Sequence, residues 1–182
     1  IRALLDRVCA YMDADSERVE LEFFTDNASL WLVDERGKYV GHNAGLYDEQ
    51  SHRTVIHLET SQIAEPTTLV GTMAHEIAHL RLVGEDRVSS DAFDNELLTD
   101  LTVVFYGLGI LLANVPRAWE SDLTIWPGTD IRKSEYMTQP MFGYALAHMA
   151  WSRNERRPDW SRYLRLDARA CFKHSLRYLW ST

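Results

Sequence analysis

Two histidines and a glutamate stand close together in residues 74–80, which read AHEIAHL. Residues four apart lie one above the other on the same face of an α-helix. A helix here would therefore direct the imidazoles of His75 and His79 to one point, where one Zn²⁺ ion per chain would fit. Glu76 would lie beside the ion, and its carboxylate could accept a proton from a zinc-activated water. The pattern predicts a hydrolytic zinc site.

The residues around this motif favour a single buried helix. Pro66, followed by two threonines, predicts the start of the helix, and Gly84 predicts its end. The alternative is an ordinary amphipathic helix whose two histidines have hydrogen-bond partners and bind no metal. Burial among apolar residues disfavours this alternative, because an imidazole without a partner costs free energy when it is removed from water. These apolar residues are Leu69, Val70, Met73, Ile77, Leu80 and Leu82.

A catalytic zinc ion needs a third protein ligand and one open position for water. The acidic residues downstream of the motif are Glu85, Asp86, Asp91, Asp94, Glu96 and Asp100. Only the stretch 95–100, NELLTD, leads into a long apolar run, residues 97–115, that is expected to be helical. A carboxylate at the start of such a helix would be held rigidly. Glu96 is therefore the expected third ligand. Asp100, four residues further on, could accept a hydrogen bond from the far nitrogen of a ligand histidine.

HEIAH followed by NELLTD resembles the pattern of the gluzincins, the thermolysin-like metallopeptidases, which carry HExxH and then NExxxD on the next helix. The resemblance covers residues 75–100, and the spacer between the two motifs is within the range of small gluzincins. It implies that His75, His79 and Glu96 are the zinc ligands. It also implies that Glu76 is the general base and that Asp100 orients a histidine.

Glu85 is the open alternative for the third ligand. A metzincin would carry glycine at position 82 and histidine at position 85, whereas this chain has Leu82 and Glu85. A variant site with Glu85 would lack the glycine turn of that family, so Glu96 is favoured.

A helix and a small sheet are predicted before the motif. Apolar residues at helical spacing predict a helix over residues 1–14. Alternation over residues 19–24 and 29–34, with a turn at 25–28, predicts a β-hairpin. A further strand, residues 54–60, precedes the motif helix. Gluzincins have the edge strand of the cleft at a comparable place, and the resemblance implies that substrate peptides pair with it. His57 could line this cleft, although a lone strand histidine is more often a surface residue.

Helices are predicted for most of the chain after the motif. Residues 91–114 are expected to form one buried helix, too short in its apolar part to span a bilayer, which needs about 20 such residues. Gly107 and Gly109 would allow a neighbouring helix to approach closely. Further helices are expected over residues 140–151 and 160–180. Residues 115–140 are irregular and aromatic, which is typical of a lid or an interaction surface.

Three side chains from this helical part are candidates for stabilising the oxyanion of a tetrahedral intermediate. The resemblance implies that a tyrosine or histidine from the lower half plays this role. The candidates are Tyr136, Tyr144 and His148. For each of them, packing into the core is the alternative interpretation.

Length, charge and cysteine content limit the class of protein. A chain of 182 residues suits one domain, and its net charge of −8 argues against a nucleic-acid surface and for simple solubility. No membrane segment is expected. Cys9 and Cys171 form no CxxC pair and are interpreted as ordinary thiols in a reducing, cytoplasmic compartment. No signal peptide is visible, and the start at Ile1 instead of Met is consistent with lost upstream sequence.

Together these patterns predict a single α+β, zincin-like domain over residues 1–182. A small twisted, mostly antiparallel sheet would form the upper part, residues 1–84, and helices the lower part, residues 85–182, with the cleft between them. The expected function is zinc-dependent hydrolysis of a peptide or protein substrate. Two alternatives stay open: a zinc-binding interaction domain without catalysis, and a peptidase module of a larger protein that is inactive until released. No feature indicates the cleavage specificity or the oligomeric state.

Overall fold

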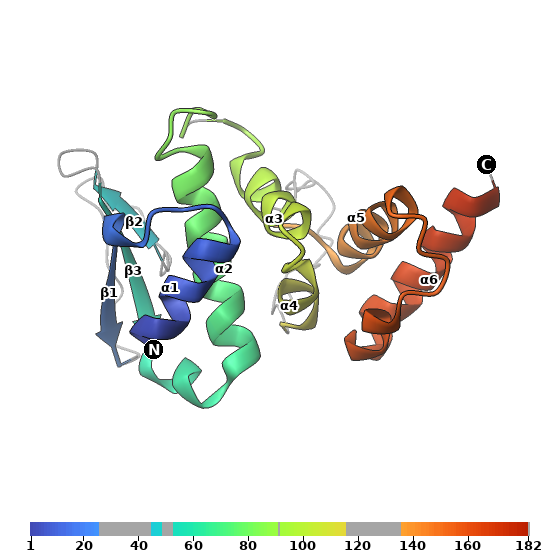
Figure 1. Ribbon diagram of the computed structural model, residues 1–182, viewed down its shortest axis with the longest axis horizontal. Coiled ribbons are helices and arrows are strands. Elements are labelled where there is room, and N and C mark those ends of the chain that lie inside the picture. The colour runs from blue at the N-terminus through green and yellow to red at the C-terminus, as the bar shows by residue number, and fades with distance from the viewer. Residues whose placement is uncertain (26–44, 49–52, 91, 116–135, 182) are drawn as a thin grey trace, which may run out of the picture. The chain divides into compact units, whose positions relative to one another are not determined.

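The computed structural model describes residues 1–25, 45–48, 53–90, 92–115 and 136–181. They belong to two compact units, Ile1–Asn95 and Glu96–Thr182 (Figure 1). The strand predicted over residues 29–34 lies outside the described residues, as does most of the irregular stretch 115–140.

The first unit contains a three-stranded sheet with the order β1-β3-β2. β1 (Val19–Phe24) pairs in parallel with β3 (Arg53–Glu59) over six residue pairs. β2 (Gly45–Asp48) pairs with the other side of β3 in the antiparallel sense. Among the described residues, β3 is therefore the central strand, with β1 on one side of it and β2 on the other.

The predicted zincin-like α+β fold with a mostly antiparallel sheet is wrong. The protein is mainly helical, and of the two strand pairings that the described residues form, the longer is parallel. The prediction that residues 54–60 form an edge strand is also wrong, because β3 has a paired strand on each side, β1 along Thr54–Glu59 and β2 along Arg53–Ile56. Alternating hydrophobicity identifies the buried face of a strand but does not specify its partner or their relative direction.

α1 (Arg2–Tyr11) and α2 (Pro66–Leu82) lie on the same side of the sheet (Figure 1). The predicted first helix is confirmed, although it ends earlier than expected. The predicted bounds of the motif helix are confirmed as well: Pro66 is suited to the first turn because its missing N–H would have no partner there. The core of the first unit is formed by Leu5, Val8, Cys9, Met12, Val19, Ile56, Leu58, Leu69, Met73, Ile77 and Leu80.

The long helix predicted over residues 91–114 is broken into α3 (Asn95–Phe105) and α4 (Gly109–Asn114). Gly107 has a positive φ of 84°, which ends α3 because other residues adopt this conformation only at a cost. Its N–H donates to the carbonyl of Val104, and the N–H of Leu108 donates to that of Val103, as in a Schellman motif. Among the described helices, none combines the length and the apolar character that crossing a membrane requires.

The close approach predicted at the two glycines is observed at Gly109, within this helix pair. A Cβ atom built on Gly109 would clash with Cγ2 of Val104. The glycine therefore allows α4 to turn back tightly on the end of α3. The helix that approaches Gly109 closely is therefore α3, the one directly before it in the chain.

α5 (Gln139–Ser152) and α6 (Leu166–Ser181) pack against each other in the second unit. A Cβ atom built on Gly143 would lie 2.5 Å from Cβ of Cys171, so the glycine permits the close crossing of the two helices. α5 matches its prediction. The helix predicted from residue 160 starts later, because a short 3-10 helix (Asp159–Tyr163) is followed by Leu164 in an extended conformation. The buried hydrophobic residues of the two helices are Phe142, Leu146, Ala147, Ala150, Ala168, Phe172, Leu176 and Leu179.

Candidate metal centre

The two motif histidines lie one turn apart on α2. The centroids of the rings of His75 and His79 are 4.9 Å apart, and the ring planes meet at 82°. His75 is 9% exposed and His79 is half-buried. Met73, Ile77 and Leu80 on the same helix are fully or almost fully buried, which anchors the helix in the core of the first unit. The helix thus presents two imidazoles from a backbone that packing holds in place.

Glu96 completes a group of three metal-ligating side chains. The ligand atoms of His75, His79 and Glu96 all lie within 4.8 Å of one another. Glu96 lies in the first turn of α3. These three residues could hold a metal ion.

Glu76, the predicted general base, is only 5% exposed. It follows His75 directly on α2, so the helical turn directs its side chain about 100° away from that of the histidine. A carboxylate in this position is close to the metal-ligating group in sequence but is not part of the group. Its catalytic role stays a prediction.

Asp100 is completely buried in α3. Its Oδ2 atom accepts a hydrogen bond of 2.9 Å from the backbone N–H of Met137. This contact connects α3 with the residues that precede α5, and no sequence pattern indicated it. The predicted contact of Asp100 with a ligand histidine stays a prediction.

Glu85, the alternative third ligand, is bound by two arginines. Its Oε1 accepts a hydrogen bond of 2.7 Å from Arg81, and its Oε2 accepts one of 2.9 Å from Nε of Arg87. The Arg81 side chain is only 12% exposed, so the pair with Glu85 is largely shielded from water. A carboxylate with both oxygens engaged in this way is a poor metal ligand. The sequence signal for this pair was the i,i+4 spacing of Arg81 and Glu85.

The three oxyanion candidates are partly or largely exposed side chains of the second unit. Tyr136 is 38% exposed and Tyr144 is 46% exposed, and His148 is also exposed. The rings of Tyr144 and His148 lie 6.2 Å apart on α5, and His148 lies 5.4 Å from the ring of Trp151. None of the three belongs to the metal-ligating group, so their catalytic roles stay predictions.

His57 makes a contact within the sheet. Its Nδ1 atom lies 3.4 Å from Oε2 of Glu22, the residue opposite it on β1. The His57 side chain is 24% exposed and that of Glu22 is 63% exposed. This cross-strand pair favours the interpretation of His57 as a surface residue.

The two cysteines are both free. Cys9 is completely buried in α1, and burial raises the pKa of its thiol from 9.0 to about 11. The thiol is therefore protonated at neutral pH and is a poor nucleophile. Cys171 is half-buried on α6, where it contacts Gly143.

No protein-family model, curated protein or solved structure matches this chain. The function proposed below therefore rests on the geometry and chemistry of the site.

Proposed function

We propose that the protein is a zinc-dependent peptidase that uses a glutamate as general base. The observation that carries this proposal is the convergence of His75, His79 and Glu96, whose ligand atoms lie within 4.8 Å of one another. Two imidazoles and one carboxylate are a ligand set of catalytic zinc sites, which leave one position open. A structural zinc site would instead close this position with a fourth side chain, usually Cys or His.

The residues of the site would have the following roles in the reaction. His75, His79 and Glu96 would hold the ion, and a bound zinc ion would supply Lewis acidity, which lowers the pKa of water to about 7. Glu76 would accept the proton of the attacking water and deliver it to the leaving amine. The place of Glu76 supports this role, because it is largely shielded from bulk water and directly follows a ligand histidine on α2.

Two further roles belong to the same proposal. Asp100 would orient a ligand histidine through a hydrogen bond. Tyr136, Tyr144 or His148 would donate a hydrogen bond to the oxyanion. Cleavage rates of the Tyr136→Phe, Tyr144→Phe and His148→Gln variants would identify the donor, since only the donor's variant should lose rate by a factor of about 10² or more.

The metal content of the purified chain tests the ligand assignment. We expect about one zinc ion per chain for the parent protein and for Glu85→Ala, and loss of zinc for Glu96→Ala. Both substitutions remove one carboxylate from the same region, so Glu85→Ala is a matched control. Retention of zinc by Glu96→Ala together with its loss from Glu85→Ala would overturn the assignment.

Cleavage of a peptide library tests the catalytic role. Glu76→Gln keeps the size of the side chain but removes its basicity, so we expect normal zinc content and a rate reduced by a factor of about 10² to 10⁴. If the zinc-loaded parent chain cleaves no peptide, the chain is a zinc-binding interaction domain. Activity that appears only after partial proteolysis would instead identify a latent peptidase.

A further inference from the structure

Positive charge is concentrated at the C-terminal end of this acidic chain. Residues 152–182 contain eight Lys and Arg and three Asp and Glu, a net charge of +5. Because the whole chain carries −8, the other residues carry −13. Seven of the eight cations are arginines. The overall net charge therefore conceals a basic segment.

Most of these cations have no acidic partner in the part of the chain that the structure describes. Only Arg165 pairs with a carboxylate, that of Asp167 at 3.3 Å. Glu155 is engaged by the indole N–H of Trp160, which donates to it at 3.0 Å. The guanidinium of Arg169 binds backbone carbonyls, among them that of Leu164. The cations that remain are Arg153, Arg156, Arg157, Arg162, Lys173 and Arg177.

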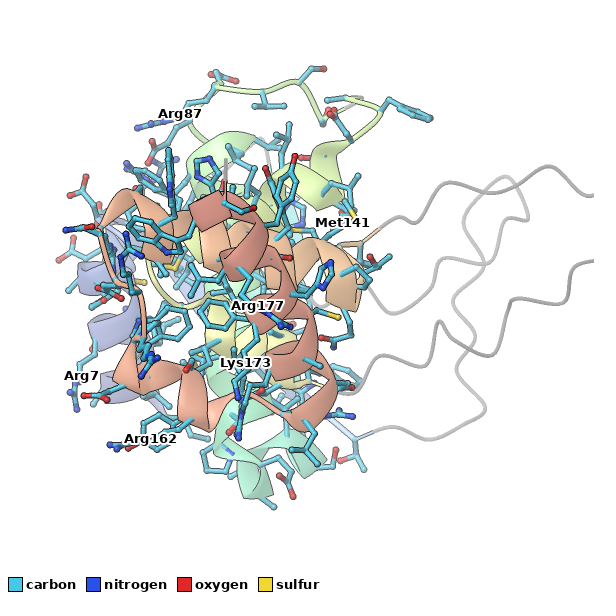
Figure 2. All side chains as sticks on the ribbon, turned by 90° about the vertical axis from the view of Figure 1, so that its right-hand side faces the viewer. Arg7, Arg87, Met141, Arg162, Lys173 and Arg177 are labelled. Carbon is cyan, nitrogen blue, oxygen red and sulfur yellow. The ribbon has the colours of Figure 1, made fainter. Side chains whose placement is uncertain are left out.

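Lys173 and Arg177 lie four residues apart on the exposed side of α6, and both are on the side that faces the viewer in Figure 2. Arg156 lies with its Cζ atom 4.1 Å above the ring of Trp180. Trp180 is three residues after Arg177, so the two are neighbours on the helix surface. We call Arg156, Lys173 and Arg177 the α6 basic face.

We propose that the α6 basic face binds an acidic segment of a protein partner. Arginine forms paired hydrogen bonds with carboxylates, and stacking on Trp180 orients Arg156 before a partner arrives. Lys173 and Arg177 are exposed, so a row of carboxylates could reach both. If the partner is a substrate, this face selects proteins with acidic segments; that role rests on the proposed peptidase activity, whereas the binding does not.

The structure favours an acidic protein segment over a lipid surface. A helix that lies in a bilayer interface needs an available apolar face. The apolar side of α6 is buried within the second unit and includes Phe172 and Leu176. On its exposed side the large hydrophobic residues are Leu166 and Tyr178, which stand among charged and polar side chains.

An acidic protein segment is also favoured over nucleic acid. Nucleic acids carry a negative charge at every phosphate and extend beyond a short basic face. A long polyanion would therefore also experience repulsion from a chain whose other residues carry −13. A short acidic segment can end where the basic face ends.

Fluorescence anisotropy with a labelled oligo-glutamate peptide tests the proposal. We expect saturable binding that weakens with salt, and no binding of an oligo-lysine peptide. Each exposed ion pair contributes up to about fivefold in affinity. The double variant Lys173→Glu/Arg177→Glu should therefore raise the Kd by about tenfold or more. Both side chains are exposed, and circular dichroism would verify that the variant is folded.

Arg7→Glu is the control for charge alone. Arg7 is exposed on α1 in the first unit, and its substitution alters the net charge as Arg177→Glu does. We expect unchanged peptide binding by Arg7→Glu and also by Glu76→Gln. Binding by Glu76→Gln separates this inference from the proposed catalysis, because the peptide can bind whether or not the chain cleaves.

Three kinds of result would overturn the inference. The first is that binding does not depend on this face: oligo-glutamate does not bind, or Arg7→Glu and Arg177→Glu weaken its binding equally. The second is tighter binding of single-stranded oligothymidylate than of oligo-glutamate with the same dependence on Lys173 and Arg177, which would indicate nucleic acid. The third is preferential binding to phosphatidylserine vesicles, which would indicate a lipid surface.

Discussion

The backbone N–H of Met137 donates a hydrogen bond of 2.9 Å to Oδ2 of Asp100, a side chain with no exposure to water. Asp100 lies one helical turn after Glu96 on α3, and Met137 lies just before α5. The same carboxylate that is proposed to orient a metal ligand therefore also holds the backbone just before α5 in place. Its structural contribution can be measured separately from its proposed role at the metal.

Asp100→Ala should lower the free energy of unfolding of the metal-free protein by about 1–3 kcal/mol. The physical reason is that the buried N–H of Met137 loses its acceptor and has no water to replace it. Urea unfolding with a chelator present measures this effect. Asp159→Ala, which removes an exposed carboxylate from the same unit, should be nearly neutral. Equal stability of the parent chain and Asp100→Ala would contradict the prediction.

The pair formed by Arg81 and Glu85 should contribute more to stability than an exposed pair with the same spacing. Glu85→Ala removes the 2.7 Å hydrogen bond that the largely buried guanidinium of Arg81 donates to Glu85, at an expected cost of about 1–3 kcal/mol. Asp6→Ala is the matched control, because it breaks an exposed i,i+4 pair with Arg2 and should cost no more than about 0.5 kcal/mol. Thermal unfolding of the two variants tests this prediction. Similar losses of stability in Glu85→Ala and Asp6→Ala would contradict it.

Substitution of Gly107 should destabilise the turn between α3 and α4. Its φ of 84° lies in the left-handed region, where a side chain with a Cβ atom costs about 1–2 kcal/mol. Gly107→Ala should therefore lower the free energy of unfolding by about this amount. Gly107→Asn should lower it less, because asparagine tolerates this conformation. The same urea experiment compares the two, and a neutral Gly107→Ala would be inconsistent with the observed turn.

Stability should decrease at alkaline pH because of Cys9. Burial raises the pKa of its folded-state thiol from 9.0 to about 11. Below pH 9 the thiol is protonated in both states, so the stabilising contribution is fully present. Between pH 9 and about 11 the unfolded state releases the proton and the folded state does not, so stability falls by about 2–3 kcal/mol. Cys9→Ala should lose this component of the pH dependence, whereas Cys171→Ala should retain it.

The motif helix is the part of the protein that the sequence determined on its own. Pro66 and Gly84 predicted the ends of α2 closely, and the i,i+4 spacing placed His75 and His79 on one face of it. These properties depend on residues within one or two turns of each other. Helix geometry and capping act over that same short range, so no information about the rest of the chain was needed.

The choice between two possible third ligands needed tertiary structure. Both Glu85 and Glu96 follow the motif at a distance from which a carboxylate could reach a metal. Arg81 and Arg87 engage Glu85, while the ligand atoms of Glu96 and the two histidines come within 4.8 Å of one another. Such contacts depend on how the chain turns after α2. A local pattern cannot specify this.

The pairing of the strands was likewise decided only by the tertiary structure. The alternation in residues 19–24 correctly predicted a strand, but β1 pairs with the distant β3 and in the parallel sense. Backbone N–H and C=O groups are identical along every strand. The partner is therefore selected by what the whole unit can bury against α1 and α2, which is a property of the assembled core and not of any one segment.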